Sequence, residues 1–482
     1  MGYGLPSPKD KKWAMLAKFL ESSWFERCWV VQEVVVSQGD PLILCGDQQL
    51  LWSVFQKAIV WLSQHTAFRT DRMVLINSIK TISGRQEWDH NESANVVSGL
   101  PTLLLLTTLF RATDPKDNIF SLLGLTKETR STNEWPKVLN PDYSRSVQDL
   151  YREVTKYCIR TEGNLSILSQ CDCSYSRVKE SSFPSWVPRW DLIPSTRRIS
   201  AFRWTSTPDN CQNVIETFNE ASKGTTLAMD EETHINVLRL RGLRLSNVDV
   251  CLPTVAIEDP ASPPGLPEHL YLFLETKIPE FYNICKEKVR HTSSMPFDKT
   301  FFLVTSAGLT PDNQDASHEP LMHFHAFLAR TKNTLKKDQP DLDPTESLRS
   351  MVKSSLQITM PGSVSPQMAT AEGDDSRSTH DRKGESERVR PNPARYLTGL
   401  MRLLNRRLFI TASGQLGLGP AHMMSGDVVV VLFGGNVPYI LRPLESGQWV
   451  FVGECYIEGL MRGEAVRGPD FQEESCAWFE LV

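Results

Sequence analysis

The spacing of apolar residues divides the N-terminal part of the chain into helical and extended segments. Residues 11–20 repeat apolar side chains at three- and four-residue steps, which is the pattern of one helix face. After a break at 22–23, a second helix is expected to begin at Trp24. The run Leu42–Cys45, closed by a turn at 46–47, is typical of a short strand, and helical spacing returns after it. The sequence therefore predicts a mixed α/β passage.

A helix start is indicated in RATDPKDNIFSLLGL, residues 111–125. Thr113 or Asp114 is placed to cap a helix whose first turn contains Asp117. Carboxylates at this end of a helix meet exposed amides and the positive end of the helix dipole. Capping therefore explains Asp114 and Asp117 better than catalysis does, and Ile119–Leu123 supplies the apolar stripe.

A longer amphipathic helix is predicted in PDYSRSVQDLYREVTKYCIR, residues 141–160. Ser144 or Ser146 begins it, the apolar residues that follow fall on one face, and Gly163 ends it.

The segment FPSWVPRWD, residues 183–191, cannot be helical, because prolines stand at 184 and 188. An extended segment with two tryptophans is suited to lie on a surface that helices already provide. We expect Trp186 and Trp190 to stack on the preceding helices as a structural clasp.

The second half of the chain changes pattern three times. Residues 95–260 are read as helical and mixed α/β, ending in an alternating, strand-like stretch, and 261–340 are read as helical. Residues 341–395 mix both charges with Ser and Gly, which predicts a disordered linker. Short apolar runs separated by Gly, Pro and Asp then predict a small antiparallel β module over 396–482.

Glycines in the motif GQLGLG, residues 414–419, do not have the spacing of a dinucleotide-binding fingerprint. The motif lies between predicted strands, so Gly417 and Gly419 are interpreted as parts of a turn.

Composition limits the classes of function. The chain has 482 residues, 40% hydrophobic and 23% charged, with a net charge of -5, which describes a globular protein with no field to attract nucleic acid. The apolar stretch 100–110 is too short to span a bilayer. The ten cysteines are scattered and spell out neither a disulfide framework nor a metal site. We expect a cytoplasmic protein with no membrane span, no metal and no nucleic-acid partner.

Familiar catalytic motifs are missing from the sequence, including the phosphate loop, the serine elbow and the zinc-helix motif. One carboxylate stands out, that of Glu33, which follows Gln32 inside the apolar run WFERCWVVQEVVVS. Either this carboxylate performs chemistry or it lies at the wet edge of a helix.

Five blocks in one order resemble the heterokaryon incompatibility (HET domain) proteins of filamentous fungi. They are WFERCWVVQEVVVSQGDPLILCGD, RATDPKDNIFSLLGL, PDYSRSVQDLYREVTKYCIR, FPSWVPRWD and the C-terminal strands from FITASGQLGLGP onward. The resemblance implies a role in non-self recognition after hyphal fusion, leading to programmed cell death.

The resemblance also implies a role for Glu33. The HET domain is similar to the TIR domain, whose helix places a glutamate four residues after a tryptophan, and Trp29 and Glu33 keep that spacing. This implies cleavage of NAD at the nicotinamide ribosyl bond, with the carboxylate stabilising the cationic sugar. No cofactor other than NAD is implied.

The earlier blocks of the HET domain are not found in this sequence. Residues 1–65 are therefore expected to form the C-terminal part of a HET domain, a partial TIR-like α/β remnant without a complete nucleotide pocket. This favours a protein that is not an enzyme and that binds a protein partner.

Three hypotheses follow for the function. The first is an interaction component of fungal incompatibility signalling, the second a TIR-like NAD hydrolase that uses Glu33, and the third an accessory protein of a secondary-metabolite gene cluster. For the fold, we expect Trp24, Trp29 and Val35 to pack against the helix around Ile119–Leu123.

Overall fold

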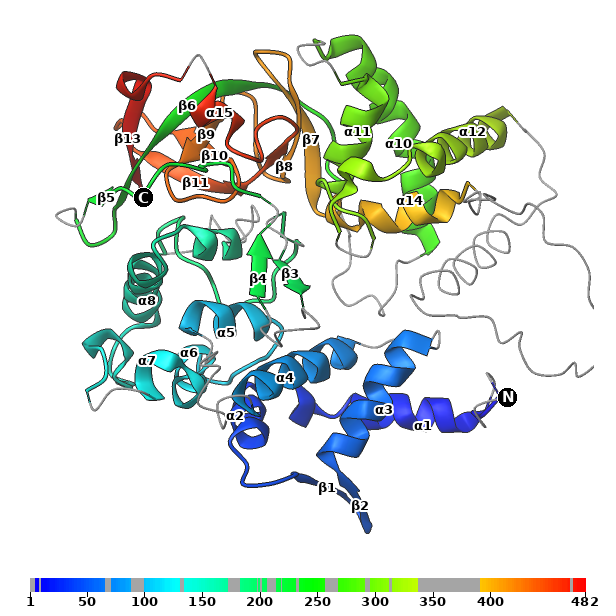
Figure 1. Ribbon diagram of the computed structural model, residues 1–482, viewed down its shortest axis with the longest axis vertical. Coiled ribbons are helices and arrows are strands. Elements are labelled where there is room, and N and C mark those ends of the chain that lie inside the picture. Colours follow the sequence, from blue (N-terminus) through cyan, green and yellow to red (C-terminus); the bar gives the residue numbers. More distant parts are fainter. Residues whose placement is uncertain are drawn as a thin grey trace, which may run out of the picture.

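The computed structural model describes residues 5–7, 10–65, 71–87, 99–130, 134–171, 183–196, 198–199, 202–205, 214–217, 219–230, 234–255, 268–290, 295–311, 314–336, 391–468 and 471–482. Figure 1 shows one group of helices at the N-terminal end, a second in the middle, a β-barrel, and a third helical group beside the barrel. The mixed α+β class predicted from the sequence is confirmed at this level, whereas a TIR-like remnant is not confirmed. None of the described helices is long and apolar enough to cross a membrane.

The N-terminal group surrounds an aromatic core. It contains α1 (Lys11–Leu20), η1 (Ser23–Glu26), α2 (Cys28–Val35), α3 (Trp52–His65) and α4 (Asp71–Glu87), with a hairpin of β1 (Leu42–Cys45) and β2 (Gln48–Leu51). The rings of Phe19, Phe25 and Phe55 meet in this core. The predicted strand and turn are confirmed.

The prediction that a helix begins at Trp24 is wrong. The α-helix begins at Cys28, because Arg27 is extended and forms a parallel bridge with Arg111. Trp24 therefore lies before α2, and its ring packs edge-on against Trp52 of α3, with centroids 6.2 Å apart. The helix α2 itself does contact the region around Ile119–Leu123, where Trp29 and Val35 were expected to pack.

The middle group carries one predicted helix start and shifts the other, because Lys116 stands at the N-cap where Thr113 or Asp114 was expected, and no side chain caps that helix. Its elements are α5 (Leu100–Leu106), α6 (Asp117–Phe120), η3 (Leu123–Leu125), α7 (Lys127–Arg130), η4 (Lys137–Leu139), α8 (Val147–Glu162) and η5 (Ser166–Gln170). The predicted start and stop of α8 are confirmed, since the Ser146 hydroxyl accepts a hydrogen bond from Asp149 N and Gly163 has a φ of 63°.

A closed β-barrel ends the chain. The long strand β6 (Leu238–Cys251) pairs with β13 (Cys476–Leu481) on one side and β9 (Val428–Leu432) on the other. The ring is completed by β11 (Trp449–Glu454) and β10 (Tyr439–Pro443), because β13 pairs with β11, β11 with β10, and β10 with β9. Closure leaves these strands without a free edge.

The strand β6 continues beyond the ring. Its end pairs with β7 (Arg406–Thr411), which pairs with β8 (Leu416–Pro420), which pairs with β12 (Tyr456–Ile457). Smaller elements are β5 (Met229–Asp230), which pairs with β6, the hairpin of β3 (Phe202–Thr205) and β4 (Val214–Thr217), α15 (Glu464–Arg467) and η8 (Glu473–Ser475).

The third helical group is inserted between β6 and β7 in the sequence. It contains α10 (Glu268–Lys288), α11 (Phe297–Ser306), η6 (Ala316–His318), α12 (Met322–Lys336), α14 (Pro393–Gly399) and η7 (Leu400–Arg402). Aromatic rings fill its centre, where Phe324 packs against Phe301 and Tyr396. Segments far apart in the sequence thus flank one barrel (Figure 1).

The second half of the chain differs from the sequence predictions in its strand directions and at two glycines. The β module over 396–482 is not purely antiparallel, because β11 and β13 run parallel, and its sheet takes β6 from outside that range. Gly417 and Gly419 lie within β8 and not in a turn, so that prediction is wrong. The predicted linker 341–395 lies outside the described residues up to 390, and α14 begins at Pro393 within its final residues. The predicted domain boundaries otherwise stay predictions.

Candidate functional site

The carboxylate proposed for catalysis, Glu33, lies on the exposed side of α2. The opposite side of the helix buries Cys28, Val31 and Val34. Its neighbour Gln32 is half-buried against Gly124, where an added Cβ would lie 2.7 Å from Gln32 Nε2. Gln32 therefore has a packing role, which explains why a polar residue occurs in this apolar run.

A short parallel bridge joins the first sequence block to the second. Arg111 N donates to Glu26 O at 2.7 Å, and Cys28 N donates to Arg111 O at 2.9 Å. These bonds satisfy backbone groups at the start of α2, where Arg27 provides no side-chain cap. Burial raises the pKa of the Cys28 thiol, with a smaller contribution from the charge of Asp117, so this cysteine is a packing residue rather than a nucleophile.

Charged side chains gather before α6, as the sequence predicted. Asp114 Oδ1 accepts a hydrogen bond from Lys116 N, and Lys116 Nζ lies 3.5 Å from Asp114 Oδ2. Asp117 accepts a hydrogen bond from the hydroxyl of Tyr143 at 2.6 Å. This bond, together with burial and the nearby carboxylates, raises the pKa of Tyr143 to about 12. The carboxylates therefore bind groups of the chain itself.

Tyr143 was not identified from the sequence as a partner of Asp117, although it lies in the third block. Tyr151 of the same block donates from its hydroxyl to Pro115 O at 2.6 Å. The second and third blocks are thus held together by two tyrosines that reach back from the start of α8.

The clasp segment is not helical, as predicted, but it is not extended either: it turns at 185–186 and at 190–191 and lies on α8. The Trp190 ring meets the Tyr151 ring edge-on, with centroids 4.9 Å apart, and Trp190 Nε1 donates to Gln170 Oε1 at 2.9 Å. Trp186 is fully buried and donates from Nε1 to Asn236 O at 3.1 Å, just before β6. The two tryptophans therefore connect the middle helices to the barrel.

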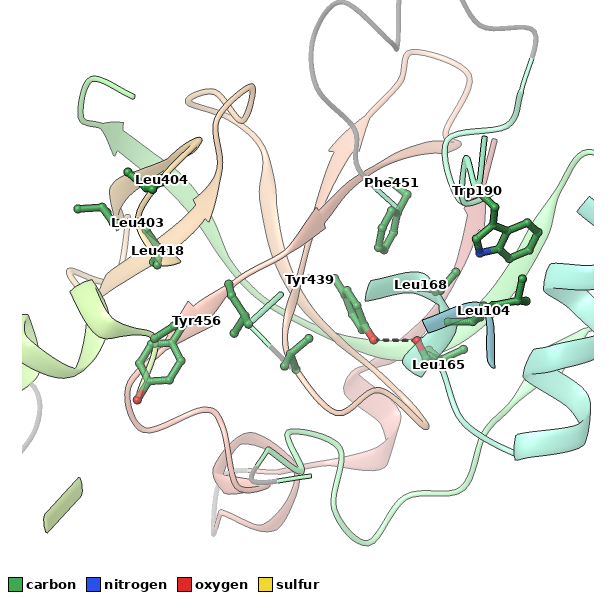
Figure 2. Close-up of a cluster of buried hydrophobic side chains, with 14 of the residues drawn as sticks. Leu104, Leu165, Leu168, Trp190, Leu403, Leu404, Leu418, Tyr439, Phe451 and Tyr456 are labelled. Carbon is green, nitrogen blue, oxygen red and sulfur yellow. Dashed lines mark hydrogen bonds between the residues drawn. The ribbon is translucent and has the colours of Figure 1, made fainter. Parts of the chain in front are cut away.

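Further hydrogen bonds fix the clasp and η5 to the barrel. Ser185 N donates to Val482 O at 3.0 Å, and its hydroxyl accepts from Phe451 N at 2.8 Å. Figure 2 shows Tyr439 of β10 directing its hydroxyl to Leu165 O, beside Phe451 and Leu168. The barrel wall and the middle helices share one apolar core.

Charged residues missed from the sequence form an ion cluster at the same junction. Arg406 Nη2 lies 2.8 Å from Glu454 Oε1, both side chains are buried, and the same oxygen accepts from Ile199 N at 2.5 Å. Burial lowers the pKa of Arg198 to about 10, and the charge of Glu454 opposes this shift. Arg and Glu are ordinary surface residues, so only the fold reveals that they are buried together.

The glycines of β8, in the sheet that extends beyond the closed ring, permit close packing of neighbouring side chains. An added Cβ would lie 2.4 Å from the Phe409 ring at Gly417 and 2.4 Å from Met423 Sδ at Gly419. Neighbouring side chains therefore leave no room for a larger residue at either glycine. Among the described residues, no group of His, Cys, Asp and Glu is arranged to hold a metal ion.

The first block contacts the second, and the later blocks meet at the junction of the middle helices with the barrel. Residues 336–473 match the Het-6 beta-barrel domain family. Over these residues the chain is similar to HET-family proteins. The barrel is completed by β6 and β13, which lie outside the matched residues.

One relative covers nearly the whole chain. It is heterokaryon incompatibility protein 6, OR allele, of Neurospora crassa (strain ATCC 24698 / 74-OR23-1A / CBS 708.71 / DSM 1257 / FGSC 987), with 21% identity over 93% of this chain and 65% of the relative. The chain thus spans about two-thirds of that relative's length. No solved structure matches the chain.

Proposed function

We propose that this chain acts in fungal heterokaryon incompatibility as an interaction component. The proposal is supported by the match to the Het-6 beta-barrel domain and by the similarity to heterokaryon incompatibility protein 6. In this role the chain binds a protein partner in the cytoplasm after hyphal fusion and contributes to the signal for cell death.

One observation carries the preference for interaction over catalysis. The polar groups of the blocks bind other parts of the chain: Tyr143 binds Asp117, Trp190 binds Gln170, and Trp186 binds Asn236. A catalytic centre keeps carboxylates or nucleophiles directed at a space for substrate. Here the polar side chains instead form hydrogen bonds that hold segments of the chain together.

The test uses the fungus that carries this gene. Strains with and without the gene are fused to an incompatible strain, and growth and vital-dye uptake of the fused cells are measured. We expect cell death to require the chain. Fused cells that die equally in its absence would overturn the proposal.

Two variants sharpen this test. Trp186→Ala removes the buried ring that joins the clasp to the barrel, and we expect it to abolish the response. Glu33→Gln changes an exposed side chain, and we expect it to retain the response. Loss of the response in Glu33→Gln at normal protein abundance would contradict an interaction role for this chain.

A second candidate function is NAD hydrolysis by Glu33. The observation that favours it is the exposed position of the Glu33 side chain, which leaves the carboxylate accessible on α2. The purified chain is incubated with NAD and released nicotinamide is measured. Under our preferred proposal no turnover is expected, whereas turnover that disappears in Glu33→Gln would favour the enzyme.

A further inference from the structure

The hairpin of β1 and β2 has no third strand among the residues that the structure describes. Its two strands form a separate two-stranded sheet, and Figure 1 shows it at the edge of the molecule, beyond α2 and α3. An isolated two-stranded hairpin is only marginally stable in water, because too little of its surface is buried. The hairpin therefore has the form of an incomplete sheet.

Large apolar side chains of this hairpin are exposed to solvent. The exposed fraction is 49% for Leu42, 66% for Leu44, 39% for Leu50 and 44% for Leu51. The only charged residue between Leu42 and Leu51 is Asp47, in the turn. Natural edge strands usually carry charges, prolines or bulges that prevent pairing, and β1 has none of these along its length.

The register shows which backbone groups point outward. Trp52 N donates to Pro41 O at 2.8 Å, which makes Pro41 and Trp52 a hydrogen-bonded pair. Opposite pairs alternate between bonded and non-bonded in an antiparallel ladder, so the pairs of Leu42 with Leu51 and Leu44 with Gln49 are non-bonded. The N–H and C=O groups of Leu42 and Leu44 therefore face the free edge of β1.

This edge is complementary to itself. If two copies of β1 meet antiparallel with Ile43 on the twofold axis, Leu42 of each copy lies opposite Leu44 of the other. The outward groups of these two residues then form four hydrogen bonds, and leucine packs against leucine on one face. Such a twofold contact closes on itself and joins two hairpins into one four-stranded sheet.

The available area fits a weak dimer. The four leucines expose on the order of 300 to 400 Å² per copy, so at most roughly 700 Å² is buried in two copies. This is below the about 1,000 Å² of a stable interface, so the expected contact is weak and transient and depends on the backbone hydrogen bonds. The edge carries no net charge that would repel a second copy. The partner that this surface fits best is another molecule of the same chain.

We propose that two copies of this chain associate through antiparallel pairing of their β1 edges, centred on Ile43. The inference rests on the geometry of the hairpin and is independent of the proposed function. In this proposal β1 pairs with β1 of a second copy. The strands of the closed barrel ring cannot pair in this way, because both of their edges are already paired.

The test is sedimentation of the full chain over a range of concentrations, combined with hydrogen exchange. We expect a monomer–dimer equilibrium with a dissociation constant on the order of micromolar or weaker. Amide exchange at Leu42 and Leu44 is expected to slow as the dimer forms. A monomer at all concentrations, with unchanged exchange at these amides, would overturn the proposal.

A matched pair of variants separates the edge of β1 from that of β2. Leu44→Pro and Gln49→Pro each remove an outward N–H at directly opposite positions, so neither breaks a bond inside the hairpin. We expect Leu44→Pro to weaken dimerisation by about tenfold or more and Gln49→Pro to leave it unchanged, with the same thermal melting for both. A larger effect of Gln49→Pro would assign the contact to β2 and contradict the proposal.

Two further results of these experiments would show that β1 does not pair with a second copy of β1. Amides of Leu42 and Leu44 that are protected in a monomer would mean that another segment of the same chain covers β1. A dimer that survives both Leu44→Pro and Leu44→Lys would place the contact elsewhere on the molecule. Either result would overturn pairing through β1.

Discussion

Two strands of this protein consist entirely of apolar residues and have opposite surroundings. The strand β9, Val428–Leu432, is buried at every position, whereas β1, Leu42–Cys45, is exposed at three of its four positions. The difference is the number of neighbouring strands: within the described part of the chain, β9 pairs with β10 and β6, whereas β1 pairs with β2 alone. Burial of an apolar strand is thus decided by sheet closure and not by its own residues.

The largest expected effect compares a lysine in each strand. Val430→Lys places a charge inside the closed barrel, and we expect no folded protein, because an unpaired buried charge costs several kcal/mol or more. Leu44→Lys places the same side chain at an exposed position and is expected to change the free energy of unfolding by less than about 0.5 kcal/mol. Urea denaturation measures both. Equal destabilisation would contradict the contrast between the strands.

The next effect concerns the ion cluster that supports the barrel. Glu454→Gln leaves Arg406 buried without its countercharge, and we expect a loss of about 3 to 5 kcal/mol of stability. Adding Arg406→Met is expected to recover part of this loss, because it removes the isolated charge. Denaturation of the single and double variants tests the coupling, and additive losses would show that the pair does not act as a unit.

A smaller effect tests the closure of the barrel itself. At Gly242, where β6 passes from β13 to β9, an added Cβ would lie 2.5 Å from Val431 O. Gly242→Ala is therefore expected to cost about 1 to 3 kcal/mol through strain in the strand pairing. Gly399→Ala is the control, since its nearest neighbour would be Ser306 Cβ at 4.0 Å. If thermal melting shifts equally in both variants, steric closure at Gly242 is not the cause.

The smallest effect is at the base of the hairpin and depends on pH. Asp40 accepts hydrogen bonds from Ser53 N at 2.9 Å and from Ser53 Oγ at 2.6 Å, and these bonds hold the pKa of the Asp40 carboxyl below its usual range. A lowered pKa means that this stabilisation is complete above the ordinary carboxyl pKa and is lost as pH falls through the lowered value.

An NMR titration of the Ser53 amide is expected to report a midpoint below the ordinary carboxyl pKa of 3.8. Asp40→Asn should remove this titration and speed amide exchange in the hairpin while leaving the barrel amides unchanged. A midpoint at or above the ordinary value would contradict the hydrogen bonds at the hairpin base.

Local signals in the sequence predicted local structure well. The caps of α8 at Ser146 and Gly163 and the turn after Cys45 depend on residues close in the chain, and each was predicted. The late start of α2 was missed because Arg27 pairs with Arg111, a contact between residues far apart in the sequence. Contacts of this kind leave no local pattern.

At the candidate site, too, the sequence predicted local features but not contacts between distant residues. The positions of Asp114 and Asp117 at a helix start were predicted, but their partner Tyr143 and the buried pair of Arg406 and Glu454 were not. The glycines of β8 were taken for a turn because glycine has the same sequence signal whether it provides a turn or space for a neighbouring ring. Only the packed sheet distinguishes the two.

Hydrogen exchange of the two strands in one sample tests the central contrast most directly. At low protein concentration, amides of Val428–Leu432 are expected to exchange only through global unfolding, whereas the outward amides of Leu42 and Leu44 should exchange rapidly. Raising the concentration should slow exchange in β1 alone. Equal protection of both strands in the dilute sample would contradict the account of a closed barrel and an open hairpin.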